Sequence, residues 1–206
     1  IYDGTETSIN NVFTNINLGT SGIKNLSRIL SIKSFDNNVV ATSELTTRVT
    51  EGTTTIYVTV EVSSSILLLP EVPMTGRLDN PRVGYFTNPL TNFSDGQQRV
   101  NKKQFITRWR LEPRPEDRAA YLRGELVEPR KPIVFYIENS TPYRWRKYIK
   151  QGIEDWQVAF ERAGFKNAII AKDITEDMEV DMDDVNYSVL TYAASTKANA
   201  MGPSIL

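Results

Sequence analysis

Residues 131–174 read KPIVFYIENSTPYRWRKYIKQGIEDWQVAFERAGFKNAIIAKDI, and this stretch decides the fold class. The apolar run Ile133 to Ile137 is short enough for a buried strand. Thr141-Pro142 predicts an N-cap followed by proline at the first helical position, and Gly164 predicts the end of that helix. Residues 167–171 follow after a very short connection. This favours a right-handed crossover to a second strand that is parallel to the first.

The predicted helix carries one apolar stripe, because apolar residues recur along it at steps of three and four. The members of the stripe are Trp145, Ile149, Ile153, Trp156, Phe160 and Ala163. Polar and charged residues fall mainly on the other side, so the helix is expected to pack on a sheet. Further along, residues 187–193 (YSVLTYA) predict a third strand.

The first 70 residues favour β-structure, because they are rich in Thr, Ser, Asn, Val and Ile. Residues 39–49 and 56–63 flank Glu51-Gly52, which predicts a hairpin. In the second arm, apolar residues at even positions alternate with more polar ones and predict one buried face. The apolar set is Ile56, Val58, Val60 and Val62. Asn37-Asn38 predicts an earlier turn after a strand over 29–33, so an antiparallel sheet is expected.

The middle of the chain is broken repeatedly by Pro and Gly, and residues 88–98 are polar enough for a loop. Residues 100–111 then predict another strand, and residues 115–123 predict a short helix that ends at Gly124. The sequence therefore predicts an α+β fold in three parts. These are an antiparallel β-rich accessory domain with its linker over 1–98, a connecting strand and short helix over 99–130, and a strand-helix-strand-strand subdomain over 131–206.

Composition excludes several function classes. A formal net charge of -1 over 206 residues gives no field that would attract nucleic acid or an anionic membrane. No run approaches the roughly 18 apolar residues that a transmembrane helix needs. The chain contains no Cys and no His, so disulfides, thiol nucleophiles and the commonest metal ligand are absent from it.

Several stretches together resemble a family of Bacteroidetes zincin-type metalloproteases of the metzincin kind. Residues 131–174 and 187–206 (YSVLTYAASTKANAMGPSIL) are similar to the opening of its catalytic domain. RVNKKQFITRWRLEP (99–113) and YLRGELVEPRKPIVFYI (121–137) extend the likeness. VTVEVSSSILLLPEVPMTGRLDNPRVGYFTN (58–88) resembles the β-rich domain that precedes the catalytic domain in that family.

This resemblance implies a partial zincin-like subdomain over 131–206. In the family, two His one turn apart on an HExxH helix and a further ligand hold zinc, and the intervening Glu is the general base. That helix lies downstream of the stretches matched here, so we expect this sequence to be part of a longer protein, with zinc in the parent and none in this part. No catalytic or metal-binding residue is expected in this chain, and residues 1–206 alone are expected to be inactive.

The resemblance also implies a substrate-binding edge strand, to which an extended peptide or protein substrate adds by backbone hydrogen bonds. The residues in the matching place in sequence order are Ala198, Asn199, Ala200, Met201 and Gly202. Small residues suit such an edge because a substrate backbone can approach closely, but an ordinary edge strand is an equally good interpretation.

Other charged clusters have plainer interpretations. Asp177, Glu179, Asp181, Asp183 and Asp184 are dense enough to suggest a cation loop, yet they lack the Gly and terminal Glu of an EF-hand, which favours a solvated loop. A basic strip is interleaved with Phe105 and Trp109, but acidic residues among its members favour a mixed surface. Its members are Lys102, Lys103, Arg108, Arg110, Arg114 and Arg118.

Three functional hypotheses follow. The first is the secreted or envelope zinc metalloprotease. The second is a non-catalytic binding or assembly module with a vestigial zincin-like half. Under either hypothesis, the missing C-terminal half of the same protein is a candidate partner. The third is a carboxylate-only glycan hydrolase that takes its acid/base pair from Glu138, Glu154 and Asp155, although nothing in their spacing selects them. Gly202-Pro203-Ser204 is not a nucleophile elbow, and no His is available to activate the serine.

Overall fold

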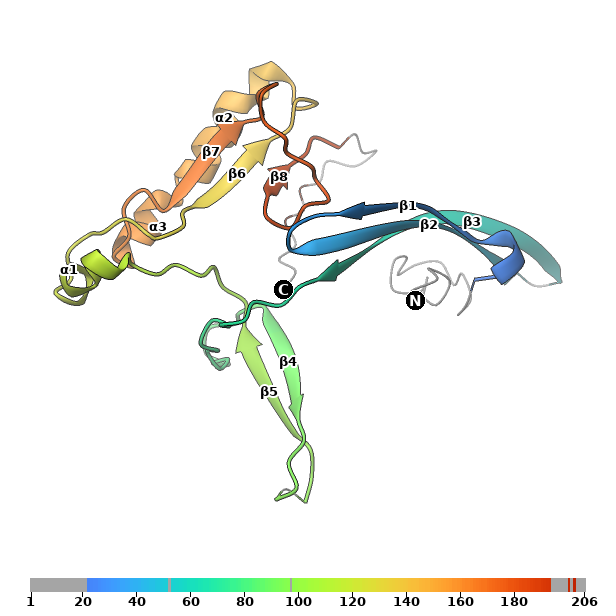
Figure 1. Ribbon diagram of the computed structural model, residues 1–206, viewed down its shortest axis with the longest axis horizontal. Coiled ribbons are helices and arrows are strands. Elements are labelled where there is room, and N and C mark those ends of the chain that lie inside the picture. Colours follow the sequence, from blue (N-terminus) through green and yellow to red (C-terminus); the bar gives the residue numbers. More distant parts are fainter. Residues whose placement is uncertain (1–21, 52, 97, 194–199, 201, 203–206) are drawn as a thin grey trace. The chain divides into compact units, whose positions relative to one another are not determined.

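The computed structural model describes residues 22–51, 53–96, 98–193, 200 and 202. The chain forms two compact units. Unit 1 comprises Ile1–Leu69 and Glu179–Tyr187, and unit 2 comprises Pro70–Met178 and Ser188–Leu206. The elements of both units are labelled in Figure 1. The fold is α+β as expected, with antiparallel sheets first and then a parallel sheet with helices.

Unit 1 is built on a three-stranded antiparallel sheet in the order β1-β2-β3. β1 spans Arg28–Ser34, β2 spans Asn38–Glu51 and β3 spans Thr54–Leu67, with a short 3-10 turn η2 (Lys24–Leu26) before β1. β2 and β3 pair along their whole length, which confirms the predicted hairpin at positions 51–52. The turn predicted at Asn37-Asn38 is placed one residue too late, because the connection between β1 and β2 comprises residues 35–37 and Asn38 is the first residue of β2.

One face of this sheet is apolar, as the alternation in β3 predicts. Leu45 on β2 is fully buried and packs with Val62, and Val49, Val58 and Val60 join them. Leu45 lies opposite Val60, so the cluster lies on one face of the β2–β3 pair. Burial fades toward the hairpin end: Ile56 is 51% exposed, and the prediction that it is buried is wrong.

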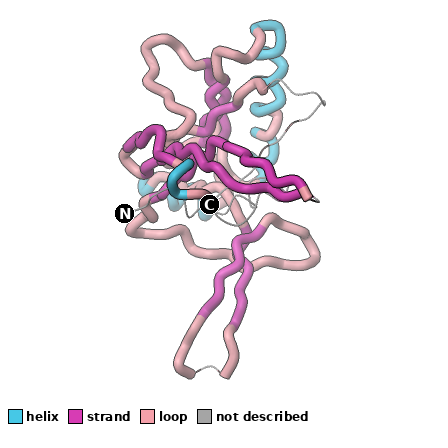
Figure 2. The backbone as a smooth tube through the Cα atoms, turned by 90° about the vertical axis from the view of Figure 1, so that its right-hand side faces the viewer, coloured by secondary structure: helices cyan, strands magenta, loops and turns pink. Residues whose placement is uncertain are grey.

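A two-stranded antiparallel hairpin follows in unit 2, formed by β4 (Thr87–Asn92) and β5 (Asn101–Ile106) and drawn side by side in Figure 2. The strand predicted over 100–111 therefore ends early. Beyond Ile106, the guanidinium groups of Arg108 and Arg110 donate to the carbonyls of Thr75 and Val72. These side-chain bonds hold the irregular segment in place where strand pairing stops.

A parallel sheet forms the centre of the second half of unit 2. β6 (Ile133–Ile137) lies between β7 (Ile169–Asp173) and β8 (Ser188–Leu190), and it pairs in parallel with both. The predicted parallel pair is confirmed. The structure places the second strand two residues later than the sequence did, and it shortens the third strand to residues 188–190.

The predicted single helix is two helices, α2 (Tyr143–Glu154) and α3 (Gln157–Arg162), which run along β6 and β7 in Figure 1. Asp155 and Trp156 interrupt it, and the Trp156 N–H reaches Ile153 O with a 3-10-type step. The predicted N-cap is also wrong. Pro142, not Thr141, is the residue before the helix, its φ of -57° and ψ of 131° are not helical, and no side chain caps the helix.

The buried face of α2 and α3 is not the predicted apolar stripe. Trp145 and Trp156 are 43% and 63% exposed and Ala163 is exposed, so these members of the predicted stripe are not core residues. The half-buried apolar side chains are Ile149, Ile153 and Phe160. Half-buried polar residues share this face at helical spacing, so its centre lies to one side of the apolar stripe. They are Arg146, Lys150 and Gln157.

A second core lies where the short helix α1 (Arg118–Leu122), preceded by the 3-10 turn η3 (Pro115–Asp117), meets the α3–β7 connection. Val127, Phe165 and Ala168 are buried there. The ring of Tyr121 stacks on Phe165 with centroids 5.0 Å apart. Gly124 and Gly164 adopt positive φ after α1 and α3, which confirms both predicted helix ends.

Candidate functional site

Open α/β sheets bind ligands at the carboxyl edge of their strands, and in this chain that edge is formed by the ends of β6, β7 and β8. Ile137, Asp173 and Leu190 end their strands in register. Two of the three end residues are apolar, so Asp173 is the charged group that the strands themselves bring to this edge.

Asp173 is held by two cations from α2. Lys150 Nζ lies 2.5 Å from Asp173 Oδ2, and Arg146 Nη1 lies 3.9 Å from Oδ1. Arg146 and Lys150 are four residues apart, so they share one face of the helix. Arg146 also donates to the carbonyls of Thr141 and Asn139, both at 2.9 Å. The cluster therefore joins the β6–α2 loop, α2 and β7. Asp173 Oδ1 is buried and accepts no hydrogen bond, so Arg146 acts on it through charge alone.

The carboxylates considered for acid/base catalysis are not brought together. Glu138 follows β6, its backbone N–H donates to Leu190 O at 3.0 Å, and its side chain accepts from Ser140 Oγ at 2.8 Å. Glu154 and Asp155 lie at the far end of α2, a helix of about 18 Å at 1.5 Å per residue. Glycosidase carboxylates lie roughly 5 to 10 Å apart, so this geometry does not support the glycan-hydrolase hypothesis.

The residues of this chain do not fit a zincin metal site. The sequence has no His and no Cys. Within the described residues, no group of three or more potential ligands lies close enough to hold a metal ion. No zinc chemistry is therefore assigned to the residues of this chain.

The predicted substrate-binding edge segment falls largely outside the described residues. Ala198, Asn199 and Met201 lie outside them, while Ala200 and Gly202 are exposed and belong to no helix or strand. The predicted role of this segment in substrate binding stays a prediction.

The acidic cluster splits into members with different partners. Asp177 accepts from the Thr175 hydroxyl. Lys33 on β1 lies within 3.1 Å of both oxygens of Asp181 and donates to Asp183 at 2.8 Å. Lys33 therefore supplies the positive charge beside these two carboxylates. This part of the predicted solvated loop is bound to β1.

The contacts of the acidic cluster shift the pKa values of three groups, one upward and two downward. Hydrogen bonds to Asp183 and then to Asp181 raise the pKa of Lys33 above that of an ordinary lysine. The backbone N–H of Asp183, followed by Lys33, lowers the pKa of Asp181. The Thr175 hydroxyl lowers the pKa of Asp177. The charged forms of all three groups are therefore favoured.

Three of the six members of the basic strip are engaged with their own unit. Arg108 and Arg110 bind backbone carbonyls as described above, and Arg110 also pairs with Glu112 at 3.0 Å. Arg114 pairs with Glu128 at 3.1 Å. Trp109 contacts Phe135 edge-on, with centroids 6.0 Å apart. The strip is a mixed surface with internal partners, as its interleaved acidic residues predict.

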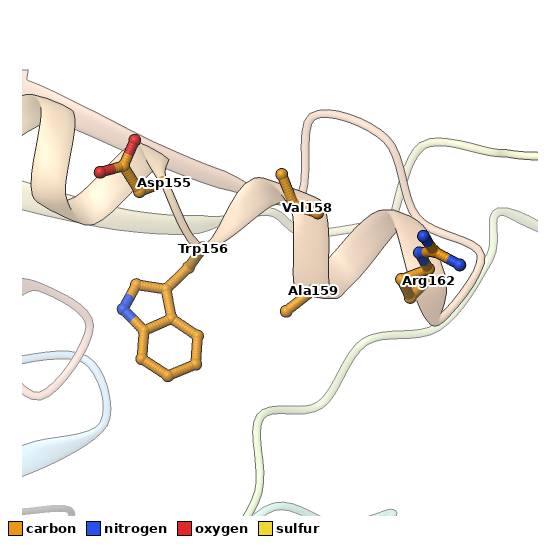
Figure 3. A pocket seen from close by; sticks show the side chains of 5 residues that line it. All are labelled: Asp155, Trp156, Val158, Ala159 and Arg162. Carbon is orange, nitrogen blue, oxygen red and sulfur yellow. The ribbon is translucent and has the colours of Figure 1, made fainter.

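A shallow hollow of about 330 Å³ lies along α3 and is drawn in Figure 3. Its lining residues are Asp155, Trp156, Val158, Ala159 and Arg162. They all come from one helical segment, and Figure 3 shows the Asp155 carboxylate and the Trp156 ring pointing away from each other. The hollow offers an apolar surface with one charge of each sign, but it brings no nucleophile or base together.

Comparison with protein families adds one finding. A family model described as "Domain of unknown function (DUF5117)" matches residues 1–114. The chain belongs to the DUF5117 family. The DUF5117 match includes the β1–β3 sheet and the β4–β5 hairpin and ends just before η3, so it does not reach the parallel sheet. No curated protein and no solved structure matches the chain.

The described part of this DUF5117 chain contains no helix that is long and apolar enough to cross a membrane. This agrees with the absence of a long apolar run in the sequence.

Sequence reasoning missed the residues that make the longest-range contacts. Asn37 and Asn38 were interpreted as turn formers alone, yet both bind residues near position 185. For Lys33, which lies on a predicted strand, nothing in the sequence indicated its contact with Asp181 and Asp183. Lys150 and Asp173 were likewise not recognised as a pair, since nothing local links residues that are 23 positions apart.

Proposed function

We propose that this DUF5117-family chain is the part of a zincin-type, zinc-dependent metalloprotease that does not bind the metal. In this proposal, unit 1 is the accessory sheet, and the segment over 133–190 is the opening of the catalytic domain. The observation that carries the proposal is the strand-helix-strand-strand order of β6, α2–α3, β7 and β8, with β6 paired in parallel on both sides. This is the order that the sequence resemblance implies.

The zinc ligands and the general base must then come from residues outside this sequence, because the HExxH motif that carries them needs two His and this sequence has none. The protein as a whole would hydrolyse peptide bonds through zinc-activated water, at the bacterial envelope or outside the cell. A peptide or protein substrate would lie along the segment around Ala200 and Gly202. Residues 1–206 alone would be inactive.

The test compares the parent protein with this chain. We expect the parent to carry about one zinc per molecule by elemental analysis and to cleave a denatured protein substrate. A chelator should abolish cleavage, and added zinc should restore it. The 206-residue chain is the matched control and should show neither zinc nor cleavage. A parent protein that carries no zinc and shows no chelator-sensitive cleavage would overturn the proposal.

A binding or assembly module is the second candidate, and one observation favours it. Large aromatic side chains on α2 and at its junction with α3 are exposed, as is common at the centres of protein interfaces. They are Tyr143, Trp145, Tyr148 and Trp156. Arg144 lies 5.0 Å from the Trp145 ring centroid. A zinc-free parent that loses a co-purifying protein on Trp145→Ala would favour this module over the protease.

A further inference from the structure

Unit 1 contains a segment from far along the chain. Residues Glu179–Tyr187, with the sequence EVDMDDVNY, belong to unit 1, although Met178 and Ser188 on either side belong to unit 2. We call these nine residues the acidic segment. The DUF5117 match ends at residue 114, so the acidic segment is bound by the family's sheet but lies outside the matched region.

Asn38 recognises the backbone of the acidic segment. Its side chain is 3% exposed, its Nδ2 donates to Asp183 O at 2.8 Å, and its Oδ1 accepts from Val185 N at 3.2 Å. One amide thus satisfies a C=O and an N–H two residues apart, as a neighbouring strand would do. Nδ2 also donates to Ser65 Oγ at 3.1 Å, which fixes the orientation of the amide. Removing these partners would leave a buried amide without hydrogen bonds, which costs free energy.

Lys33 and Asn37 recognise the side chains. Lys33 Nζ binds Asp181 Oδ2 at 2.9 Å and Asp183 Oδ2 at 2.8 Å, so it selects two carboxylates spaced two residues apart. Asn37 Nδ2 donates to Asn186 Oδ1 at 2.8 Å. We call Lys33, Asn37 and Asn38 the turn site, because they lie at or next to the β1–β2 turn.

The acidic segment is folded for this contact by its own hydrogen bonds. Asp181 Oδ1 accepts from Asp183 N at 2.9 Å, and Asp184 Oδ1 accepts from Asn186 N at 2.9 Å. These two Asx turns reduce the conformational entropy that binding would otherwise cost.

We propose that the turn site is a recognition site for an acidic peptide of the pattern Asp-x-Asp-Asp-x-Asn, and that the acidic segment occupies it as a releasable latch. The proposal does not depend on the protease hypothesis. Release is feasible because the ion pairs are partly exposed, with Lys33 at 47% and Asp181 at 39% side-chain exposure, and exposed pairs contribute little individually. Occupancy is favoured because a tethered ligand has an effective concentration on the order of millimolar.

The first test uses hydrogen exchange of the Val185 amide in the whole chain. Asn38→Ala should speed its exchange by about tenfold, because the acceptor of that amide is lost. The pair Asp181→Asn with Asp183→Asn should speed exchange by about threefold. The matched control, Glu176→Gln with Glu179→Gln, removes the same amount of charge and should leave the rate unchanged. Equal rates in all variants would overturn the latch.

The second test supplies the ligand in trans. In a chain whose residues 179–187 are replaced by a Gly/Ser segment of equal length, a labelled EVDMDDVNY peptide should bind and raise fluorescence anisotropy. The unaltered chain should not bind it, because its own segment fills the site. Lys33→Glu in the replaced chain should abolish binding, and a scrambled peptide should not bind.

Binding of the scrambled peptide, or no binding at millimolar peptide, would overturn the recognition site. If the replaced chain does not fold, the exchange measurements on full-sequence variants decide the question. A protein that competes with the labelled peptide for the replaced chain would show that the turn site also binds a separate partner.

Discussion

Gly164 lies against the ring of Tyr121. A Cβ at position 164 would be 2.7 Å from a ring carbon of Tyr121, and φ at this residue is +93°. The Tyr121 hydroxyl donates to Ala163 O at 3.3 Å, so the ring cannot move away without losing a hydrogen bond. A side chain at position 164 therefore meets both backbone strain and a steric clash.

We expect Gly164→Ala to lower the free energy of unfolding by about 1–3 kcal/mol, because it combines an unfavourable φ with overpacking. Gly152→Ala is the matched control. Gly152 lies inside α2 with no atom within 4 Å of the added Cβ, so this change should stabilise by about 0.5–1 kcal/mol. Urea denaturation followed by circular dichroism measures both, and two changes of the same sign would contradict the geometry.

The corrected helix face gives a second prediction. Phe165 is 4% exposed and stacks on Tyr121, whereas Trp156 is 63% exposed. Phe165→Ala should cost about 3–4 kcal/mol of unfolding free energy, but Trp156→Ala should cost less than about 1 kcal/mol. Thermal and urea unfolding separate these values. If Trp156→Ala lost more unfolding free energy than Phe165→Ala, Trp156 would be a core residue, as the apolar stripe in the sequence predicts.

Gln157 gives a third prediction, because it holds the start of β7. Its Oε1 accepts from Ala168 N at 3.0 Å, and its Nε2 donates to Phe165 O at 3.3 Å. Gln157→Ala leaves the buried Ala168 amide without this acceptor, which should cost about 1–3 kcal/mol. Gln151→Ala, at an exposed position on α2, should change stability by less than about 0.5 kcal/mol. Hydrogen exchange at Ala168 should quicken in the first variant and not in the second.

The sequence predicted the elements whose signals are local. The alternation from Val58 to Val62 lies within one strand, and the turn before β2, which the sequence placed within one residue of its position, is a short local connection. The helix end at Gly164 depends on one backbone angle that favours glycine. The fold class and the parallel pair followed from these signals.

What the sequence could not supply depends on contacts between distant residues. The buried face of α2 and α3 includes Arg146, Lys150 and Gln157, whose partners lie in other elements, and the apolar pattern alone gives no sign of this. The strand after Ile106 stops where arginine side chains bind carbonyls more than thirty residues away. Lys33 and Asp183 are 150 positions apart, and no periodicity links them. These features come from tertiary packing, which overrides local propensity.

The last prediction concerns pH and the latch. The pKa of Asp181 is lowered, so its stabilising contribution is present above the ordinary aspartate pKa of about 3.9 and is lost as pH falls through its lower folded value. The pKa of Lys33 is raised, so its contribution is present below about 10.4 and is lost as pH rises through its higher folded value. Between these limits, protection of the Val185 amide should not change with pH beyond the intrinsic exchange rate.

Carboxyl carbon NMR shifts of Asp181 measure the acid side directly, and the midpoint should fall below 3.9. Lys33→Met should raise that midpoint only part of the way, because the larger cause is the Asp183 backbone N–H, which the variant keeps. Lys33→Arg retains the charge and should raise it less than Lys33→Met does. A midpoint at or above 3.9 in the unaltered chain would show that Asp181 is not bound in the turn, and it would remove one half of the latch.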